Sequence, residues 1–258
     1  MSFPNDQRQP LQKGLILSSK EYKEKDTLCS FLTHEGLEQV YARGTQKNAS
    51  LNARLTRPFT LAELSFGLQY SGTYLYLFNG RVLKSFDQIY DDLDKMAVCE
   101  VLSWLTQPAP LPQQYYEPLL ETWTLLNENS PMQWTAACLI LALRFHEEGI
   151  APQVDSCVVC DKKDHIKGFS LNQGGFVCTD HAASEEISSS ARLKKIRLLF
   201  HAKWKNLQVL HDKVPFSLDE FCTLCSWYMQ LMEVEPACMR FLLMVHKNEI
   251  SDSKKDRL

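Results

Sequence analysis

Two short pairs of candidate metal ligands constrain what this chain can fold into more than any other feature of its sequence. Cys157 and Cys160 are separated by two residues, and so are Cys178 and His181. Each pair can form a tight knuckle that points both side chains at one ion, and the loop between the pairs allows them to meet as four tetrahedral ligands. Because four protein ligands leave no open coordination position, we expect one structural Zn²⁺ in a module that spans residues 151–185.

Two other interpretations of this region remain open. The three cysteines can instead be buried free thiols beside a surface histidine. The sequence His146-Glu147-Glu148 also partly matches the HxE…PCxxC signature of zinc-dependent deaminases. Ser156 replaces the proline of that signature, and only eight residues separate Glu148 from Cys157, which is too few for the intervening deaminase elements. We therefore favour a structural site and expect no enzymatic activity, and we keep a zinc-dependent deaminase or hydrolase as the less favoured alternative.

The ends and the cysteine content of the chain indicate its compartment. The N-terminal sequence MSFPNDQRQP lacks the basic and then apolar layout of a secretory signal, and the uncharged stretch over residues 129–143 is too short and too polar to span a membrane. We expect a cytoplasmic protein whose nine cysteines are thiols or metal ligands. A second CxxC, Cys222 and Cys225, lies in an apolar helical pattern, so we expect both side chains to pack in the core.

Residues 13–86 have the pattern of short β-strands. Apolar and polar residues alternate there in short runs, and glycines and other turn residues separate the runs. Asn79-Gly80, between Tyr74–Phe78 and Arg81–Phe86, has the sequence of a two-residue hairpin turn. Five or six short strands without an intervening helix pattern predict a small closed or partly open barrel over residues 1–84.

The pattern changes to helical spacing after Phe86, so the chain belongs to the α+β class. We expect residues 85–258 to form an all-α domain into which the module over 151–185 is inserted. The amphipathic stretches that predict its helices are 87–105, 115–127, 131–148, 187–209, 217–234 and 236–246.

Charge is unevenly distributed along the chain. The net charge is −3, but residues 1–84 carry +4, residues 85–150 carry −8 and residues 191–215 carry +6. Two basic regions separated by an acidic one suggest surfaces for a polyanion, although each can also be an ordinary solvated face. In the barrel region the candidate nucleic-acid-binding cations surround one predicted loop: Arg43, Lys47, Arg54 and Arg57.

The second basic region combines cations with an apolar helical face. Arg192, Lys195 and Arg197 are the candidates there for binding DNA or a protein partner. In the barrel region, Tyr70, Tyr74 and Tyr76 are able to stack on bases, but we expect at least two of the three to be ordinary strand residues.

The order of barrel, helices and metal module resembles the RecO family of bacterial DNA repair and recombination mediators. The residues that carry the resemblance are Tyr22-Lys-Glu-Lys-Asp26-Thr-Leu with Phe31, Thr33 and Gly36, then Ala42-Arg43-Gly44, then Pro58-Phe59-Thr60, and the two ligand pairs. It covers nearly the whole chain from Leu11 onward. The chain departs from the family in the fewer cations after Gly44 and in His181, where a cysteine is common.

The resemblance implies an N-terminal oligonucleotide-binding barrel and a C-terminal helical domain with a zinc module. It also implies binding of single- and double-stranded DNA, annealing of complementary strands and, together with RecR, loading of RecA onto strands coated with single-strand-binding protein, whose acidic C-terminal tail is a further partner. Such a protein works in the cytoplasm at the nucleoid, without a membrane partner. An RNA-binding barrel protein remains an alternative of a different class.

Overall fold

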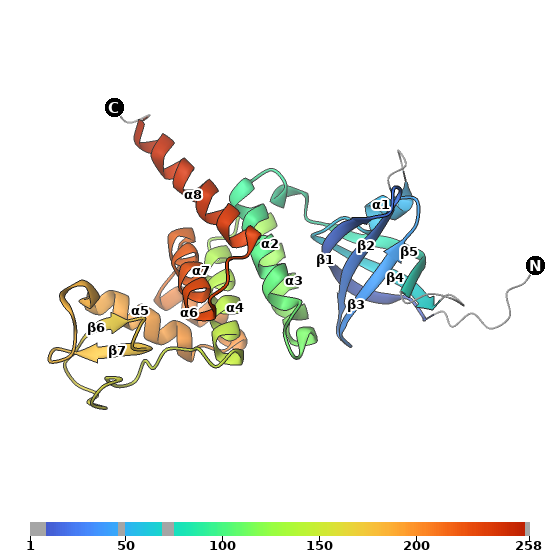
Figure 1. Ribbon diagram of the computed structural model, residues 1–258. Helices are drawn as coiled ribbons and strands as arrows, with labels where there is room; N and C mark the ends of the chain where they lie inside the picture. The colour runs from blue at the N-terminus through green and yellow to red at the C-terminus, as the bar shows by residue number, and fades with distance from the viewer. Residues whose placement is uncertain (1–8, 46–49, 69–74, 256–258) are drawn as a thin grey trace, which may run out of the picture. The chain divides into compact units, whose positions relative to one another are not determined.

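The N-terminal part of the molecule is a closed five-stranded β-barrel (Figure 1). The computed structural model describes residues 9–45, 50–68 and 75–255, with side-chain surroundings up to residue 247. The barrel strands are β1 (Gln12–Tyr22), β2 (Asp26–Thr33), β3 (Leu37–Ala42), β4 (Thr60–Leu68) and β5 (Leu75–Ser85). Their order around the barrel is β1-β2-β3-β5-β4, and all neighbours are antiparallel except β3 and β5. This topology is that of an oligonucleotide-binding barrel and confirms the predicted barrel.

The inside of the barrel is filled by apolar side chains that alternate along the strands. Phe31 and Phe66 meet edge to face, with ring centroids 5.8 Å apart, in a buried cluster of eight residues. A short helix, α1 (Leu51–Leu55), lies between β3 and β4, and its Leu55 belongs to this cluster. The sequence pattern did not predict this helix, because a five-residue segment is too short to show helical periodicity.

The hairpin predicted at Asn79-Gly80 is wrong. β5 runs through both residues as one strand of 11 residues paired with β4. Gly80 is needed there for close packing instead of for a turn, since a Cβ atom at this position would lie 2.6 Å from the carbonyl oxygen of Glu63.

Helices follow the barrel in the first of two compact units, which contains residues 1–130 together with 244–258. They are the 3₁₀ turn η1 (Asp87–Ile89), α2 (Leu93–Thr106), η2 (Pro112–Tyr115) and α3 (Tyr116–Asn127). The Asp92 side chain caps α2 by accepting a hydrogen bond from the backbone N–H of Lys95. Gln107, directly after α2, accepts a hydrogen bond of 2.8 Å from the Ser30 hydroxyl and so ties the helix to the barrel.

The second compact unit contains residues 131–243. Its elements are α4 (Gln133–Glu147), β6 (Ile166–Ser170), β7 (Gly175–Cys178), η3 (Ser184–Glu186), α5 (Ser190–His201), η4 (Trp204–Asn206), α6 (Leu207–Lys213), α7 (Leu218–Met232) and the first part of α8 (Ala237–Lys255). The single helix predicted over residues 187–209 is wrong. Ala202 and Lys203 have extended backbone angles and divide it into α5 and α6, although the amphipathic pattern continues across the break.

Helix α4 is the centre of the second unit. Its Phe145 packs edge to face on Phe200 of α5 and on Tyr228 of α7. The fully buried Arg144 is ion-paired with Glu147 and Glu148 at the end of the same helix. Cys222 and Cys225 are buried in α7, as the sequence predicted. Within the described residues, no helix is both long and apolar enough to cross a membrane.

Candidate metal centre and basic surfaces

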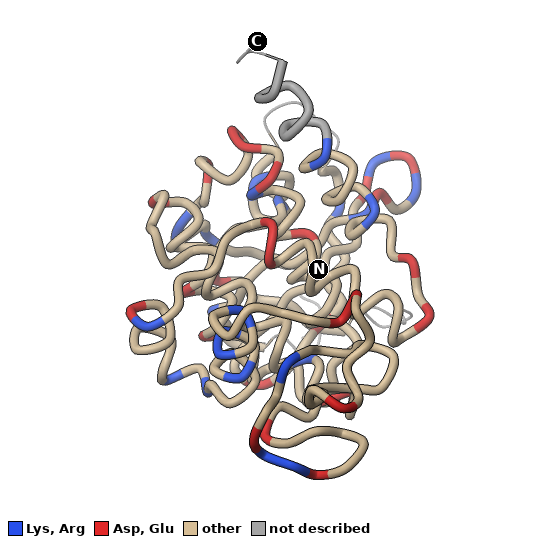
Figure 2. The backbone as a smooth tube through the Cα atoms, turned by 90° about the vertical axis from the view of Figure 1, so that its left-hand side faces the viewer, with Lys and Arg blue, Asp and Glu red and all other residues tan. Residues whose placement is uncertain are grey.

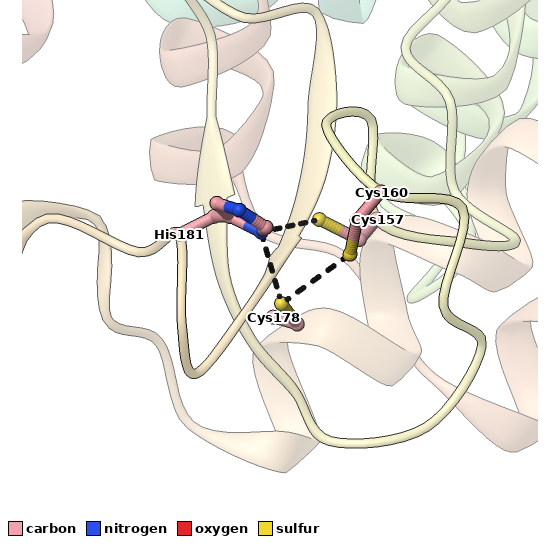
Figure 3. Close-up of side chains that lie close together, drawn as sticks. All are labelled: Cys157, Cys160, Cys178 and His181. Carbon is pink, nitrogen blue, oxygen red and sulfur yellow. Dashed lines mark hydrogen bonds between the residues drawn. The ribbon is translucent and has the colours of Figure 1, made fainter.

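The four predicted metal ligands come together at the β-ribbon of the second unit (Figure 3). Their ligand atoms all lie within 4.8 Å of one another. The Sγ atoms of Cys160 and Cys178 are 3.8 Å apart, and His181 Nδ1 lies 3.6 Å from Cys157 Sγ and 3.3 Å from Cys178 Sγ. Tetrahedral zinc bonds to sulfur and nitrogen require separations of about 3.8 Å between two sulfurs and about 3.6 Å between sulfur and nitrogen. The quartet therefore has the chemistry and the spacing of a four-coordinate metal site.

Each knuckle is closed by a backbone hydrogen bond at the equivalent position. The N–H of Asp161 donates to the carbonyl of Cys157 at 2.9 Å, and the N–H of Ala182 donates to the carbonyl of Cys178 at 2.9 Å. Asp161 has a φ of 58°, so the first knuckle turns through the left-handed region. These bonds fix the two ligands of each pair on one side of their turn.

The Cys157 thiol is prepared for metal binding by its backbone surroundings. Burial raises the pKa of this thiol, but hydrogen bonds from the backbone of Val159, Cys178 and Cys160 and from the Cys160 side chain lower it, and the pKa is about 6. The thiolate, which is the form that binds metals, is therefore the favoured form of Cys157 at neutral pH.

A third segment extends the two-stranded ribbon of β6 and β7. The backbone N–H of Phe176 donates to the carbonyl of Gln153 at 2.9 Å, and the N–H of Gln153 donates to the carbonyl of Gly174 at 2.8 Å. A Cβ atom on Gly175 would lie 2.2 Å from the Gln153 carbonyl oxygen, so only glycine allows this approach. The segment that leads into the first knuckle is therefore hydrogen-bonded to β7, the strand that leads into the second knuckle.

Helices α5 and α7 both contact the metal module. Arg197 of α5 donates a hydrogen bond of 2.7 Å to the carbonyl of Val154, and its guanidinium lies 5.2 Å from the centre of the Phe176 ring. The imidazole of His201 lies 2.8 Å from the Asp155 carboxylate. Trp227 of α7 stacks on Phe169 of β6 with ring centroids 4.6 Å apart. Arg197 was predicted to bind DNA or a partner, but its contacts here are to the module.

The residues of the deaminase alternative have other partners. His146 bonds through Nε2 to the Phe200 carbonyl at 2.8 Å. Glu147 and Glu148 are both paired with Arg144. None of the three belongs to the metal-ligand group found in the described part of the chain. An open catalytic metal site with a free carboxylate is therefore absent from this group.

The predicted cations of the barrel have different surroundings. Arg43 lies directly after β3, is exposed and has its guanidinium 4.9 Å from the centre of the Tyr76 ring. Arg54 is exposed on α1, which is tied to the Arg43 turn by a hydrogen bond of 2.7 Å from Asn52 to the Arg43 carbonyl. Arg57 is engaged elsewhere: it forms an ion pair of 2.9 Å with Asp87 and lies over the Tyr90 ring. Lys47, Tyr70 and Tyr74 lie outside the described residues.

Two of the three predicted cations of α5 line a small pocket against α7. Its volume is about 210 Å³. Arg192, Lys195 and Glu220 are its charged lining residues, and the Lys195 ammonium is 2.6 Å from Glu220. The apolar residues that line it are Ile196, Leu199, Phe200, Phe216, Leu224 and Trp227. Figure 2 marks the Lys and Arg positions along the backbone.

Comparison with known sequences agrees with this architecture. Residues 9–86 match the family described as Recombination protein O N terminal, and residues 96–218 match Recombination protein O C terminal. A DNA repair protein RecO from Lactobacillus delbrueckii subsp. bulgaricus is 32% identical over 176 residues, which are 66% of this chain and 70% of the relative. The protein of the same name from Halalkalibacterium halodurans is 23% identical over 254 residues, covering 95% of this chain and 98% of the relative.

The barrel topology and the helical part that follows it define an oligonucleotide-binding-barrel protein of DNA repair. The chain belongs to the RecO family of DNA repair and recombination proteins. The names of these relatives are those of DNA repair proteins and not of enzymes.

Proposed function

We propose that this protein is a non-enzymatic recombination mediator that works in the cytoplasm at the nucleoid. It binds single- and double-stranded DNA, anneals complementary strands and, with RecR, helps RecA to replace single-strand-binding protein. The observation that carries the proposal is the closed oligonucleotide-binding barrel with the exposed cation Arg43 fixed over an aromatic ring on its surface. Residues 1–84 are assigned to nucleic acid, and residues 85–258 to protein partners and the metal module.

The proposed metal is a single Zn²⁺ with a structural role. The tetrahedral spacing of three sulfurs and one nitrogen supports zinc, and the closed ligand set supports stabilisation in place of catalysis. Bound zinc would hold together two knuckles that have few buried apolar residues of their own. The four residues that hold it are Cys157, Cys160, Cys178 and His181.

The pocket between α5 and α7 is the proposed site for the acidic tail of single-strand-binding protein. Its apolar lining suits a hydrophobic side chain, and the lining cations Arg192 and Lys195 suit carboxylates next to it. Arg192 is exposed and has no ion pair with the described residues, whereas Lys195 already faces Glu220. Arg192 is therefore the main candidate for the tail, and Arg197 has a supporting role in the module.

Annealing of complementary oligonucleotides, without nucleotide, tests this division. Arg43→Glu is expected to weaken binding and annealing of bare strands, with the salt slope of DNA binding reduced by about 1. Arg192→Glu is the matched control on the other unit: it should leave bare-strand annealing intact and slow annealing of strands coated with single-strand-binding protein. If neither variant differs from the parent in either assay, the assignment of both surfaces is wrong.

The same binding assay addresses the RNA-binding alternative. A barrel that evolved to read RNA would contact the 2′-hydroxyl and prefer RNA over DNA of the same sequence, even at moderate salt. The proposed mediator should bind single-stranded DNA at least as tightly as RNA. A clear preference for RNA would replace the proposal with that alternative.

A further inference from the structure

Among the described residues that line the pocket between α5 and α7, one is acidic. This residue is Glu220, in the first turn of α7, and the cations Arg192 and Lys195 of α5 line the same pocket. A site proposed for the carboxylates of an acidic tail therefore already contains a carboxylate of its own.

The Glu220 carboxylate neutralises Lys195 in the free protein. Their charged atoms are 2.6 Å apart, and the Lys195 ammonium also lies 4.6 Å from the centre of the Phe216 ring, which lines the pocket as well. The Lys195 and Glu220 side chains are 23% and 36% exposed, so water screens their attraction only in part. A ligand carboxylate that approaches Lys195 must therefore compete with Glu220 and is repelled by it.

Glu220 has donors besides Lys195. The backbone N–H of Ser217 donates to its carboxylate at 2.8 Å, and the Ser217 hydroxyl donates at 3.3 Å. The same hydroxyl accepts a hydrogen bond of 3.4 Å from the N–H of Glu220, which completes the capping box of α7. None of these bonds involves Lys195. The flexible lysine side chain can consequently turn to a ligand while Glu220 keeps two donors for its charge.

Arg192 differs from Lys195 in having no internal competitor. It is exposed and forms no ion pair with the described residues. The two cations are three residues apart on α5, so they lie on the same face of the helix. The first carboxylate of a tail thus has an open cation at Arg192, whereas the next one must take Lys195 from Glu220.

We propose that Glu220 is an internal competitor for the acidic tail: its carboxylate holds Lys195 in the free protein, gives it up when the tail binds and takes it back when the tail leaves. The inference rests on the proposed binding of the tail and deepens it, because it assigns the residue that limits how tightly and how long the tail is held. A mediator that hands a strand on must release this partner again. Competition within the pocket favours that release, since the vacated Lys195 is neutralised at once.

Glu220→Gln tests the competition, because glutamine removes the charge and still completes a capping box. A fluorescent peptide of the acidic tail of single-strand-binding protein is titrated with the full-length protein, and binding is followed by anisotropy and stopped flow. We expect the variant to bind about 2- to 10-fold more tightly than the parent, mainly through slower dissociation. A peptide with asparagine in place of each acidic residue should gain nothing.

Two controls separate competition for Lys195 from a general change in charge. Asp219→Asn alters the net charge equally in the same turn of α7, but Asp219 does not line the pocket, so the affinity for the tail should stay close to that of the parent. In a Lys195→Gln background, Glu220→Gln should give a smaller gain than in the parent, since the cation in dispute is missing.

Unchanged or weaker binding of the tail by Glu220→Gln would overturn the inference, and so would an equal gain in Asp219→Asn or an undiminished gain without Lys195. The proposed tail site would stand in each of these cases, because the parent binds the tail in all of them. Failure of both the parent and Glu220→Gln to bind the tail would instead refute the proposed function of the pocket.

Discussion

The barrel and the metal module reach a defined structure in different ways. The barrel has five strands of up to 11 residues that close on themselves around a cluster of eight buried side chains. The module over residues 151–185 has two strands of five and four residues, and two of its few buried apolar positions are the ligands Cys157 and Cys178. A barrel of this kind is stabilised mainly by apolar burial, whereas the proposed zinc ion and the contacts with α5 are what we expect to stabilise the module.

The largest expected effect is the loss of a metal ligand. Cys178→Ser should abolish binding of one zinc per chain and unfold the module, because binding to such sites contributes on the order of 10 kcal/mol. Metal analysis and hydrogen exchange measure both effects. Cys238→Ser, which changes a cysteine outside the ligand group, should keep its zinc. If the barrel loses hydrogen-exchange protection together with the module, the two regions are not stabilised separately.

A cavity in the barrel should destabilise the barrel and leave the metal module unchanged. Phe66→Ala removes a fully buried ring that packs on Phe31 and should lower the free energy of unfolding of the barrel by about 3–5 kcal/mol, measured in urea. Zinc content should remain that of the parent. Leu68→Ala, on the same strand but 50% exposed, is the control and should change stability by less than about 0.5 kcal/mol.

A smaller effect is expected where the module depends on close backbone packing. Gly175→Ala would push a methyl group against the Gln153 carbonyl and should destabilise the module by about 1–3 kcal/mol. Zinc transfer to a chromogenic chelator should become faster, while urea unfolding of the barrel stays unchanged. An unchanged transfer rate would show that the third segment does not support the knuckles.

The smallest predicted effect depends on pH. Hydrogen bonds from the Tyr41 hydroxyl and the Gly44 N–H hold the pKa of Asp26 below its usual value of 3.8, so the folded barrel favours the ionised carboxylate. This contribution is present above the usual pKa and is lost as pH falls through the lowered one. Asp26→Ala should therefore cost about 1 kcal/mol at neutral pH. The difference from the parent should shrink in urea titrations as the pH falls below 3.8, and a difference that stays constant over that range would contradict this origin.

Local spacing in the sequence predicted some features well. The ligand pairs are each contained in four residues, so their geometry needs few distant contacts, and the structure places all four together. Helix starts are equally local: Ser217 and Glu220 form a capping box at the start of α7. Asn79-Gly80 gave a wrong prediction of a hairpin, because its turn propensity is overridden by pairing with the distant strand β4.

Features that depend on strand register could not be predicted. Tyr22, Tyr41 and Tyr76 are far apart in the sequence, and only the register of β1, β2, β3 and β5 aligns them. Tyr22 appeared only within a family motif, and Tyr41 carried no signal of its own. In the same way, the amphipathic pattern of α5 identified its cations but not the contacts that direct Arg197 to the module and Lys195 to Glu220.

Helix α5 has different neighbours on its two sides. Arg197 and His201 contact the module, while Arg192 and Lys195 border the proposed partner pocket. The helix is thus a common wall between the proposed zinc module and the proposed partner pocket. Under these two proposals, removal of zinc should loosen the pocket and lower the affinity for the protein partner, while DNA binding by the barrel should be unchanged. Zinc removal should then slow annealing of strands coated with single-strand-binding protein more than annealing of bare strands.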